Sequence, residues 1–237
     1  MTTFTKATNP KDAIGTKKVS LSCVSAVVIE EMMSCGTGEI SWPVIMEVSL
    51  GMLEGSCKYG RHNYRIAGVR ASVYYDAIFR HLTDWIEGTD IDPESGLSHI
   101  TKAMAGLFVL LDAYHQGMVF DDRPPVASKR LRGWTAQLSP VNESSVRRRV
   151  NAAISYLFAW WESGAWGLLT FGLTELMWLR DGMMRGDTGG LVDDRYAPRH
   201  APNWVAKLNE QAAAIIARFP DPKPPYTIQD APDYGEK

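Results

Sequence analysis

The sequence predicts an all-α protein, a helical bundle built from packed hairpins. Apolar residues recur at helical intervals along successive segments, and glycine, proline and capping residues stand between those segments. Of the 237 residues, 45% are hydrophobic and 22% are charged, which is the balance of a globular chain able to bury a core. These observations together favour a packed helical fold over a disordered one.

Three helices are expected in the first 90 residues. The spacing of apolar residues predicts them over 24–34, 43–54 and 72–87. Pro43 suits the first turn of the second helix, and Gly55 is expected to end it. In the third helix the apolar residues share one broad face: Val73, Ala77, Ile78, Leu82 and Trp85.

An acidic loop, GTDIDPESG, precedes the next expected helix. Ser95 is placed to cap this helix, and its apolar stripe runs to about Tyr114. On the opposite side His99, Lys102 and Gly106 align at i, i+3 and i+7. We therefore expect a polar helix face directly after the acidic loop.

The C-terminal half carries a buried helical hairpin that resembles a degenerate copy of this first one. A shift of 75 residues places Leu82 and Trp85 over Leu157 and Trp160, and DDRPP is echoed by DDRYAP. Chance similarity between two amphipathic hairpins is the alternative. The apolar pattern is kept while polar residues are lost, because the second copy has Asn151, Ser155 and Tyr156 where the first has Asp76, Arg80 and His81.

The chain divides into two expected parts. Residues 1–125 are predicted to form the catalytic unit, and residues 126–237 a helical C-terminal region that includes the degenerate copy. Residues 1–20 are polar and predict an irregular N-terminal arm. The tail from residue 220 is rich in proline and is expected to be extended.

Composition excludes several classes of protein. A net charge of −2 argues against stable nucleic-acid binding, because such proteins usually carry a basic surplus. The three cysteines lack the paired spacing of a zinc or dithiol site and are interpreted as reduced thiols. The uncharged runs 150–161 and 163–174 hold 12 residues each, short of the roughly 18 that span a bilayer. With no apolar leader at the start, we expect a cytoplasmic protein without a membrane segment.

Polar residues gather in four short clusters that mix cations, carboxylates and imidazoles. Hydrolysis of a phosphoanhydride needs this mixture, because carboxylates hold Mg²⁺ while lysine and arginine hold the remaining phosphate charge. Two tyrosines in the second cluster could also stack on a purine. The clusters are NPKDAIGTKK (9–18), KYGRHNYR (58–65), DAIFRH (76–81) and DIDPESGLSH (90–99).

Each cluster also has a purely structural interpretation. Asp76 and Arg80, four residues apart on one helix, could form a surface ion pair worth a few tenths of a kcal/mol. The acids before His99 could serve as helix caps favoured by the macrodipole. The segment 58–65 could be a solvated connector, and Glu47 an ordinary exposed acid.

A family resemblance favours the functional interpretation. Residues 9–125 carry NPKD, GxxKYG, DAxxRHLxxW and ESGLxH in order, and this run resembles the N-terminal domain of the phage dATP/dGTP diphosphohydrolase (MazZ-like) family. Thr89 departs from the pattern, since the family often has an acid after Gly88. The family is similar in turn to the all-α MazG-type NTP pyrophosphohydrolases, although their literal ExxE and ExxD spacing is absent here.

The resemblance implies a MazG-like helical bundle and a defined reaction. The expected activity is hydrolysis of dGTP and dATP between the α and β phosphates, giving dGMP or dAMP and diphosphate. Mg²⁺ is the expected cofactor, with Mn²⁺ as a substitute. The expected role is control of phage nucleotide pools or synthesis of 2-aminoadenine nucleotide (dZTP), in the host-cell cytoplasm if the chain is phage-encoded. A homo-oligomer is expected, because MazG-type sites lie between helix pairs.

The resemblance, taken together with the position and type of each residue, suggests candidates for three roles. Catalysis is assigned to Asp76, His81 and His99. Substrate binding is assigned to Lys11, Lys17, Lys58, Tyr59, Asn63, Arg65, Arg80 and Lys102. Metal binding is assigned to Glu47, Asp76, Asp92 and Glu94.

Two other functions stay open from the sequence. A dNTP triphosphohydrolase would use a histidine–aspartate metal site, for which Asp76, His81 and His99 are candidates, although an adjacent His-Asp pair is absent. A non-catalytic nucleotide-binding or host-interaction protein would use the tryptophans and the proline-rich tail as partner surfaces. The products formed from dGTP would separate all three.

Overall fold

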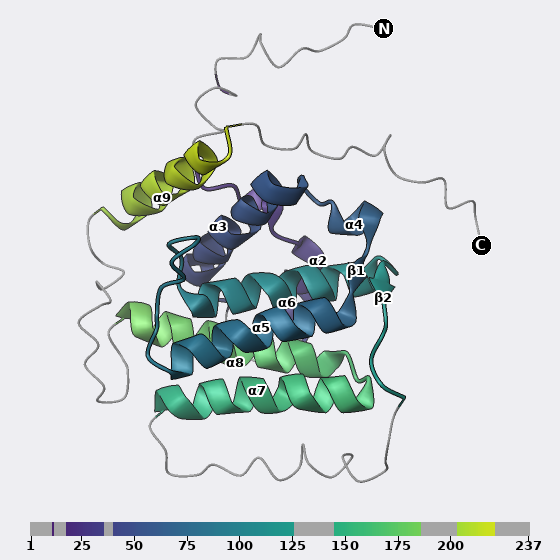
Figure 1. Ribbon diagram of the computed structural model, residues 1–237. Helices are drawn as coiled ribbons and strands as arrows, with labels where there is room; N and C mark the ends of the chain where they lie inside the picture. The colour runs from purple at the N-terminus through teal and green to yellow at the C-terminus, as the bar shows by residue number, and fades with distance from the viewer. Residues whose placement is uncertain (1–10, 12–17, 36–39, 126–144, 186–202, 221–237) are drawn as a thin grey trace, which may run out of the picture.

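The described part of the chain is helical, which confirms the all-α prediction (Figure 1). The computed structural model describes residues 11, 18–35, 40–125, 145–185 and 203–220. Among these residues the only strands are β1 (Val69–Arg70) and β2 (Val119–Phe120), which pair in parallel. The helices are η2 (Leu21–Cys23), α2 (Ala26–Ser34), α3 (Trp42–Tyr59), α4 (Tyr64–Ala67), α5 (Ala71–Ile86), α6 (His99–His115), α7 (Ser145–Ser163), α8 (Gly167–Arg185) and α9 (Trp204–Arg218).

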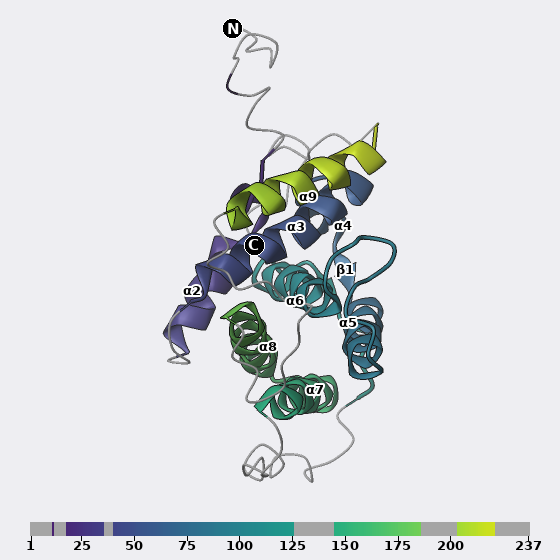
Figure 2. The same cartoon turned by 90° about the vertical axis from the view of Figure 1, so that its left-hand side faces the viewer.

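Helices α5 to α8 form a four-helix bundle, seen end-on in Figure 2. Within the hairpins α5 packs on α6 and α7 on α8; between them α6 packs on α8 and α5 on α7. Tyr75 near the start of α5 stacks on Trp161 near the end of α7, with 4.3 Å between ring centroids. Tyr114 near the end of α6 stacks on Trp166, just before α8, at 4.1 Å. The facing helices of the two hairpins therefore run antiparallel.

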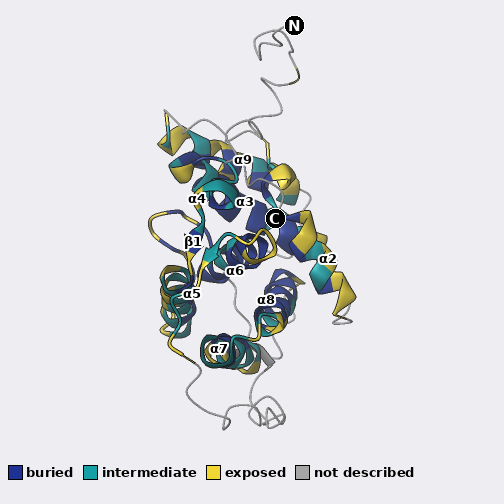
Figure 3. Cartoon of the chain, turned by 90° about the vertical axis from the view of Figure 1, so that its right-hand side faces the viewer, coloured by how far each residue is buried: buried dark blue, intermediate teal, exposed yellow. Residues whose placement is uncertain are grey.

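One hydrophobic core joins the two hairpins. Its fully buried side chains include Ile78 and Phe108 from the first hairpin and Trp160 and Leu169 from the second. Figure 3 shows the buried faces of these helices turned toward each other and the exposed faces turned outward. Each such side chain contributes roughly 1.5–3 kcal/mol of burial free energy. Residues on both sides of the expected boundary at residue 125 thus stabilise the same core.

Helix α3 packs on α6, and α9 packs on the far side of α3 (Figure 2). A second apolar cluster lies between α3 and α9, with Leu50 and Leu208 among its buried members. Gly51 allows α3 to approach α6 closely, because a Cβ at this position would lie 2.9 Å from the Cβ of Ala105. This close approach places the polar end of α3 beside the start of α6.

The start of α5 is capped by a residue from after β2. The amide of Ser72 donates to Asp122 Oδ1 at 2.9 Å, and its hydroxyl donates to Oδ2 at 2.6 Å. These hydrogen bonds hold the pKa of the Asp122 carboxyl below its ordinary value. The cap therefore links the end of the first hairpin to its beginning.

Two helix ends differ from the sequence prediction. Helix α3 continues through Gly55 and stops at Gly60, whose φ of 96° lies in the left-handed region that suits glycine. Helix α6 begins at His99, with Ser98 as its N-cap, whereas Ser95 lies in the preceding loop. The prediction failed here because two serines three residues apart are equally good caps by residue type.

Several expectations fall on residues outside the described ranges. These are most of the N-terminal arm, including Lys17, and the tail from residue 221. Within the described ranges, no helix is both long and apolar enough to cross a membrane.

Candidate active site

A cavity of about 460 Å³ lies between α3, α5 and α6 and is closed at one end by the turn that joins α3 to α4. Small residues make room for it on α6, where Ala105 and Gly106 line the wall. A Cβ on Gly106 would approach Ile78 Cγ1 to 2.8 Å, so a larger residue would push α5 and α6 apart. The small residues Ala105 and Gly106 thus let α5 and α6 pack closely and leave the space beside α3 unfilled by side chains of α6.

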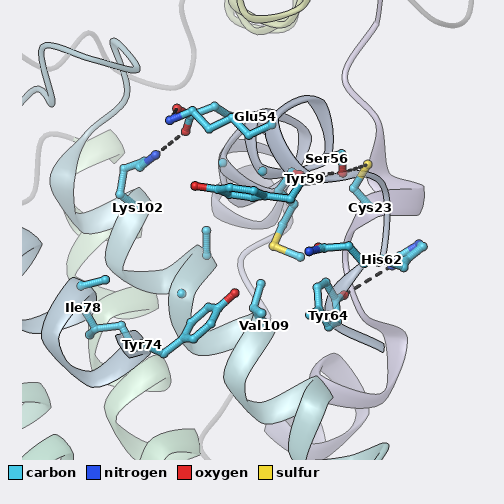
Figure 4. A pocket seen from close by; sticks show the side chains of 18 of the residues that line it. Cys23, Glu54, Ser56, Tyr59, His62, Tyr64, Tyr74, Ile78, Lys102 and Val109 are labelled. Carbon is cyan, nitrogen blue, oxygen red and sulfur yellow. Dashed lines mark hydrogen bonds and ion pairs between the residues drawn. The ribbon is translucent and has the colours of Figure 1, made fainter. Parts of the chain in front are cut away.

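The polar wall centres on Glu54, a carboxylate of α3 that is only 2% exposed. Lys58, one turn further along, donates to Glu54 Oε1 at 2.8 Å. Lys102 of α6 reaches the other oxygen, Oε2, as Figure 4 shows. Burial alone would lower the pKa of Lys58, but its hydrogen bonds to Glu54 and Glu94 raise it above the ordinary value. Lys58 is therefore held as a cation at the cavity wall, and Lys102 shares its carboxylate partner.

The loop between α5 and α6 adds two carboxylates to this wall. Glu94 Oε1 lies 2.5 Å from Lys58 Nζ, and Asp92 Oδ2 lies 3.9 Å from Lys102 Nζ. The hydrogen bond from Lys58 lowers the pKa of Glu94. Burial alone would raise the pKa of Asp92, but hydrogen bonds from the Ser95 hydroxyl and the Glu94 amide lower it overall. All these contacts favour ionised carboxylates.

An arginine of α9 holds the same loop in place. Arg218 Nη1 donates to the carbonyl of Glu94 at 2.5 Å, and Nη2 donates to the carbonyl of Ser95 at 2.6 Å. Arg218 thus fixes the backbone that carries the two acidic side chains. The C-terminal region contributes to the site in this way without lining the cavity.

The opposite side of the cavity is aromatic and apolar. Tyr59 and Tyr74 extend into it from α3 and α5, and His62 and Tyr64 flank its far end (Figure 4). Burial, followed by the neighbouring Tyr59, raises the pKa of Tyr74 to about 12, so its hydroxyl stays protonated. His62 has a φ of 56°, an uncommon conformation for a side-chain-bearing residue, and its Nε2 donates a hydrogen bond to the Ser22 carbonyl.

His81 lies on the cavity wall and meets a second histidine. Its Nδ1 is 2.9 Å from Nδ1 of His99, and Asp84 Oδ2 lies 3.8 Å from the same His99 nitrogen. Burial, then Lys102 and His99, lowers the pKa of His81 to about 4. The imidazole of His81 is therefore neutral at neutral pH.

The structure brings five of the sequence-predicted residues to the cavity wall: Lys58, Tyr59, Asn63, His81 and Lys102. Two predicted metal ligands, Asp92 and Glu94, contact the cavity lysines. His99 lies directly behind His81.

Other predicted residues lie away from the cavity. Asp76 and Arg80 are on the exposed face of α5. The cavity is lined by a different face of this helix, which carries Tyr74, Ala77, Ile78 and His81. Lys11 is exposed, outside the set of lining residues.

Two more predicted residues are held in ion pairs instead. Arg65 makes a bidentate pair with the fully buried Asp112, at 2.8 and 3.1 Å. Glu47 makes a bidentate pair with Arg180 of α8, at 2.7 and 2.9 Å, and accepts from the Thr101 hydroxyl. These contacts stabilise the packing of α4 on α6 and of α3 on α8.

Three residues of the site were missed by sequence reasoning. Glu54 could have been found from its i, i+4 spacing with Lys58. Tyr74 shares a helix face with His81, two turns away, and that face could have been chosen over the one that holds Asp76. Arg218 carries no local signal, since its partners lie more than 120 residues earlier.

The part of the chain that lines the cavity is also the part that matches a known protein family. Residues 8–123 match the family model described as dATP/dGTP diphosphohydrolase, N-terminal. This segment is therefore similar to the N-terminal domain of that family. It contains α3, α5 and α6, and every residue that lines the cavity falls within it.

A relative from Salmonella phage PMBT28 carries the name dATP/dGTP diphosphohydrolase. It is 30% identical over 99 residues, which are 41% of this chain and 33% of the relative. The chain therefore spans about a third of the length of the relative that it matches. No solved structure matches the chain.

Proposed function

We propose that this chain hydrolyses purine deoxynucleoside triphosphates, dGTP and dATP, to the monophosphate and diphosphate. The observation that carries the proposal is the cavity within the family segment, with two lysines sharing the buried Glu54 at its polar wall and tyrosines opposite. One wall suits an anionic chain, and the other suits a planar base. A nucleotide has both parts.

The charges of the polar wall support binding of a triphosphate only together with a cation. Glu54, Asp92 and Glu94 face Lys58 and Lys102, so the cluster is one unit negative. A polyanion would be repelled by that cluster alone, because charges about 4 Å apart interact by several kcal/mol near a protein surface. Added positive charge from a divalent ion would reverse the balance.

The donor set fits Mg²⁺, with Mn²⁺ as a substitute. The three carboxylates offer only hard oxygen ligands, the kind that Mg²⁺ prefers. Phosphate oxygens would compete for Lys58 and Lys102 and thereby release carboxylate oxygens of Glu54, Asp92 and Glu94 for the metal. The ion would supply charge neutralisation of the phosphates and activation of a water molecule.

The residues of the chain have separate tasks in this proposal. Lys58 and Lys102 bind and orient the phosphates, and they stabilise the negative charge that develops as water attacks one phosphorus of the α–β bridge. His81, neutral at this wall, offers a hydrogen bond to the water or to a phosphate oxygen without adding charge. The bond between the attacked phosphorus and the bridge oxygen breaks, so that monophosphate and diphosphate separate, and the attacking water loses its proton to solvent or to a carboxylate.

The aromatic wall would hold the base. Tyr59 and Tyr74 provide ring faces for stacking, and Asn63 provides an amide that can both donate and accept hydrogen bonds. Purines offer more stacking area than pyrimidines, which agrees with a preference for dGTP and dATP. Supply of dGMP for 2-aminoadenine nucleotide synthesis, or removal of dATP from a phage nucleotide pool, is the role that we propose for this reaction.

A triphosphohydrolase is the second candidate, favoured by the cluster of His81, Asp84 and His99 beside the cavity. This enzyme class would release nucleoside and triphosphate. The two candidates predict different phosphorus products from the same substrate.

The test is to incubate the full chain with dGTP and Mg²⁺ and to identify the products by ³¹P NMR. Diphosphate with dGMP supports the proposal, triphosphate supports the second candidate, and the absence of turnover for both dGTP and dATP contradicts both. Glu54→Gln should abolish turnover. The exposed Glu210→Gln, on α9, is the matched control and should retain it.

A further inference from the structure

We propose that His81, Asp84 and His99 form a binding site for a transition metal ion of the Zn²⁺ class, separate from the carboxylates of the polar wall. In the described residues this is the group in which three ligand-type side chains converge, with one ligand atom of each within 4.8 Å of the others. The inference rests on this geometry and does not depend on the proposed function.

The three side chains come from two adjacent helices. His81 and Asp84 are three residues apart on α5, so they share a face of that helix. His99 is the first residue of α6 and faces them across the hairpin. Two ligands from one helix and one from its neighbour can close around an ion without any change in the backbone.

The distances are close to those of a metal site. Zn–N bonds of about 2.0–2.1 Å at a tetrahedral angle place two nitrogen ligands about 3.4 Å apart. The Nδ1 atoms of His81 and His99 are 2.9 Å apart, and Asp84 Oδ2 is 3.8 Å from His99 Nδ1. Widening the first distance and shortening the second by about half an ångström, with Asp84 also drawn toward His81 from within 4.8 Å, would give tetrahedral spacing. Side-chain rotations alone can supply such shifts.

His99 is buried, and its two ring nitrogens have different surroundings. The His99 side chain is 4% exposed, and its Nε2 has no hydrogen-bond partner among the described residues. Its Nδ1 is the nitrogen that faces His81 and Asp84, so Nδ1 is the ligand atom, and the inference rests on the geometry of this group. With both Nδ1 atoms on a metal, each imidazole would carry its proton on Nε2, and the ion would replace the hydrogen bond between the two rings.

The pairing distinguishes these rings from the other described histidines. His62 meets the Ser22 carbonyl, and His115 meets Glu31, so each of those rings has an oxygen partner. His81 and His99 instead turn nitrogen toward nitrogen. When two neutral imidazole rings face each other in this way, one of the two facing nitrogens must act as the hydrogen-bond acceptor. Two facing imidazole nitrogens are also a common arrangement for metal ligands.

The donor set points to the class of metal. Two imidazole nitrogens and one carboxylate oxygen suit Zn²⁺, Co²⁺, Mn²⁺ or Fe²⁺ better than Mg²⁺, which prefers oxygen alone. Asp84 is 54% exposed, so solvent can complete the coordination and the ion has an open path to the site. Three protein ligands with open positions are the arrangement of catalytic rather than structural zinc sites.

The test uses the metal-free full chain and Co²⁺ as a spectroscopic probe. We expect one Co²⁺ per chain with visible d–d absorption, displaced by an equimolar amount of Zn²⁺ and not by Mg²⁺. His81→Gln and Asp84→Asn should each weaken Co²⁺ binding at least about tenfold. Asp84 is exposed, so its substitution leaves the core intact, and circular dichroism checks the fold of both variants.

Matched controls are His115→Gln, an imidazole at the other end of α6, and Glu87→Gln, an exposed acid just after α5. Both should bind Co²⁺ as the unsubstituted chain does. Absence of Co²⁺ binding to the unsubstituted chain, or equal binding by folded His81→Gln and Asp84→Asn variants, would overturn the proposal. Because metal content is measured rather than turnover, failure here leaves the proposed nucleotide hydrolysis untouched, and the reverse also holds.

Discussion

The two hairpins of the bundle share a core pattern but differ on the faces that do not meet in the core. Leu82 and Leu157 are 75 residues apart and are buried to nearly the same extent, and Leu110 and Leu179 are 69 apart and likewise buried. Trp160 is fully buried, whereas Trp85 at the corresponding position is partly buried. Packing positions therefore tolerate little change between the hairpins, while other positions change freely.

The same separations of 75 and 69 residues relate the linings of two cavities, one on each hairpin. His81 and Lys102 line the cavity of the first hairpin, and the residues at the corresponding positions of the second, Tyr156 and Phe171, line a cavity of about 470 Å³ on α7 and α8. In the first hairpin α3 covers this face and contributes Glu54. The second cavity also carries a charged pair, Arg149 with Glu175. What sets the first apart is the covering helix α3, with Glu54 and the two lysines that share it.

The bundle also has equivalent contacts at its two ends. Glu47 accepts from Thr101 near the start of α6 and pairs with Arg180 near the end of α8. Glu31 accepts from Thr170, 69 residues after Thr101 and near the start of α8, and pairs with a histidine at the end of α6. This equivalence explains why Glu47 has a structural role although it resembles a metal ligand in the sequence.

The largest expected effect is on stability, in the second hairpin. Trp160→Ala should lower the free energy of unfolding by about 3–5 kcal/mol, because a fully buried aromatic side chain is removed and a void is left. Trp85→Ala should cost less, about 1–3 kcal/mol, since that side chain is partly buried. Urea unfolding measures both. Equal losses would show that the two hairpins contribute alike to the core.

The next effect concerns activity, in the first hairpin. Lys102→Ala should lower kcat/KM for dGTP about 100-fold, or ~2.7 kcal/mol, because a phosphate contact is lost and buried Glu54 keeps only Lys58 as its partner. Phe171→Ala, at the corresponding position of the second hairpin, should change kcat/KM less than about twofold. Steady-state kinetics with dGTP measures both variants. A large loss of kcat/KM in Phe171→Ala would show that the second hairpin also takes part in the reaction.

A smaller effect tests the equivalent glutamates. Glu47→Gln and Glu31→Gln should each lower the free energy of unfolding by about 1–3 kcal/mol, because each leaves a basic partner and a hydroxyl less well satisfied. Neither substitution should alter the Mg²⁺ concentration needed for half-maximal turnover. A shift of that concentration in Glu47→Gln alone would restore Glu47 as a metal ligand.

The smallest effect is at the cap of α5. Asp122→Ala should lower the free energy of unfolding by about 1 kcal/mol, the usual value of a helix cap. Because the folded-state pKa of Asp122 lies below its ordinary value, this contribution is present above the ordinary aspartate pKa and is lost as pH falls through the lowered value. Thermal unfolding at neutral and acid pH measures it, and an equal difference between the two proteins at both pH values would contradict the cap.

Much of the fold could be predicted from the sequence because helical periodicity is a local signal. The apolar stripes of α5 and α6 are visible in the residue order, and all-α architecture follows from them. The exact start of α6 could not be predicted, since Ser95 and Ser98 are both good caps. In the structure the Ser95 hydroxyl bonds Asp92 within the loop, and Arg218 of α9 holds the Ser95 carbonyl.

The candidate site was only partly predictable, because helix faces are fixed by packing partners. Asp76 and His81 lie on one helix, and residue type alone did not show which of them faces α3. Glu47 and Glu54 are both acids of α3, but one meets Arg180 and the other meets two lysines. Arg180 and Lys102 are far away in the sequence, so the only local signal that distinguishes the two acids is Lys58, four residues after Glu54.

The most direct test of the account is a crystal structure of the chain with Mg²⁺ and a non-hydrolysable α,β-methylene analogue of dGTP. We expect one nucleotide per chain in the cavity between α3, α5 and α6, with its phosphates on Lys58 and Lys102 and its base between Tyr59 and Tyr74. The cavity on α7 and α8 should hold no nucleotide. Density for the nucleotide on α7 and α8, or phosphates on the exposed Arg80 face of α5, would contradict the account.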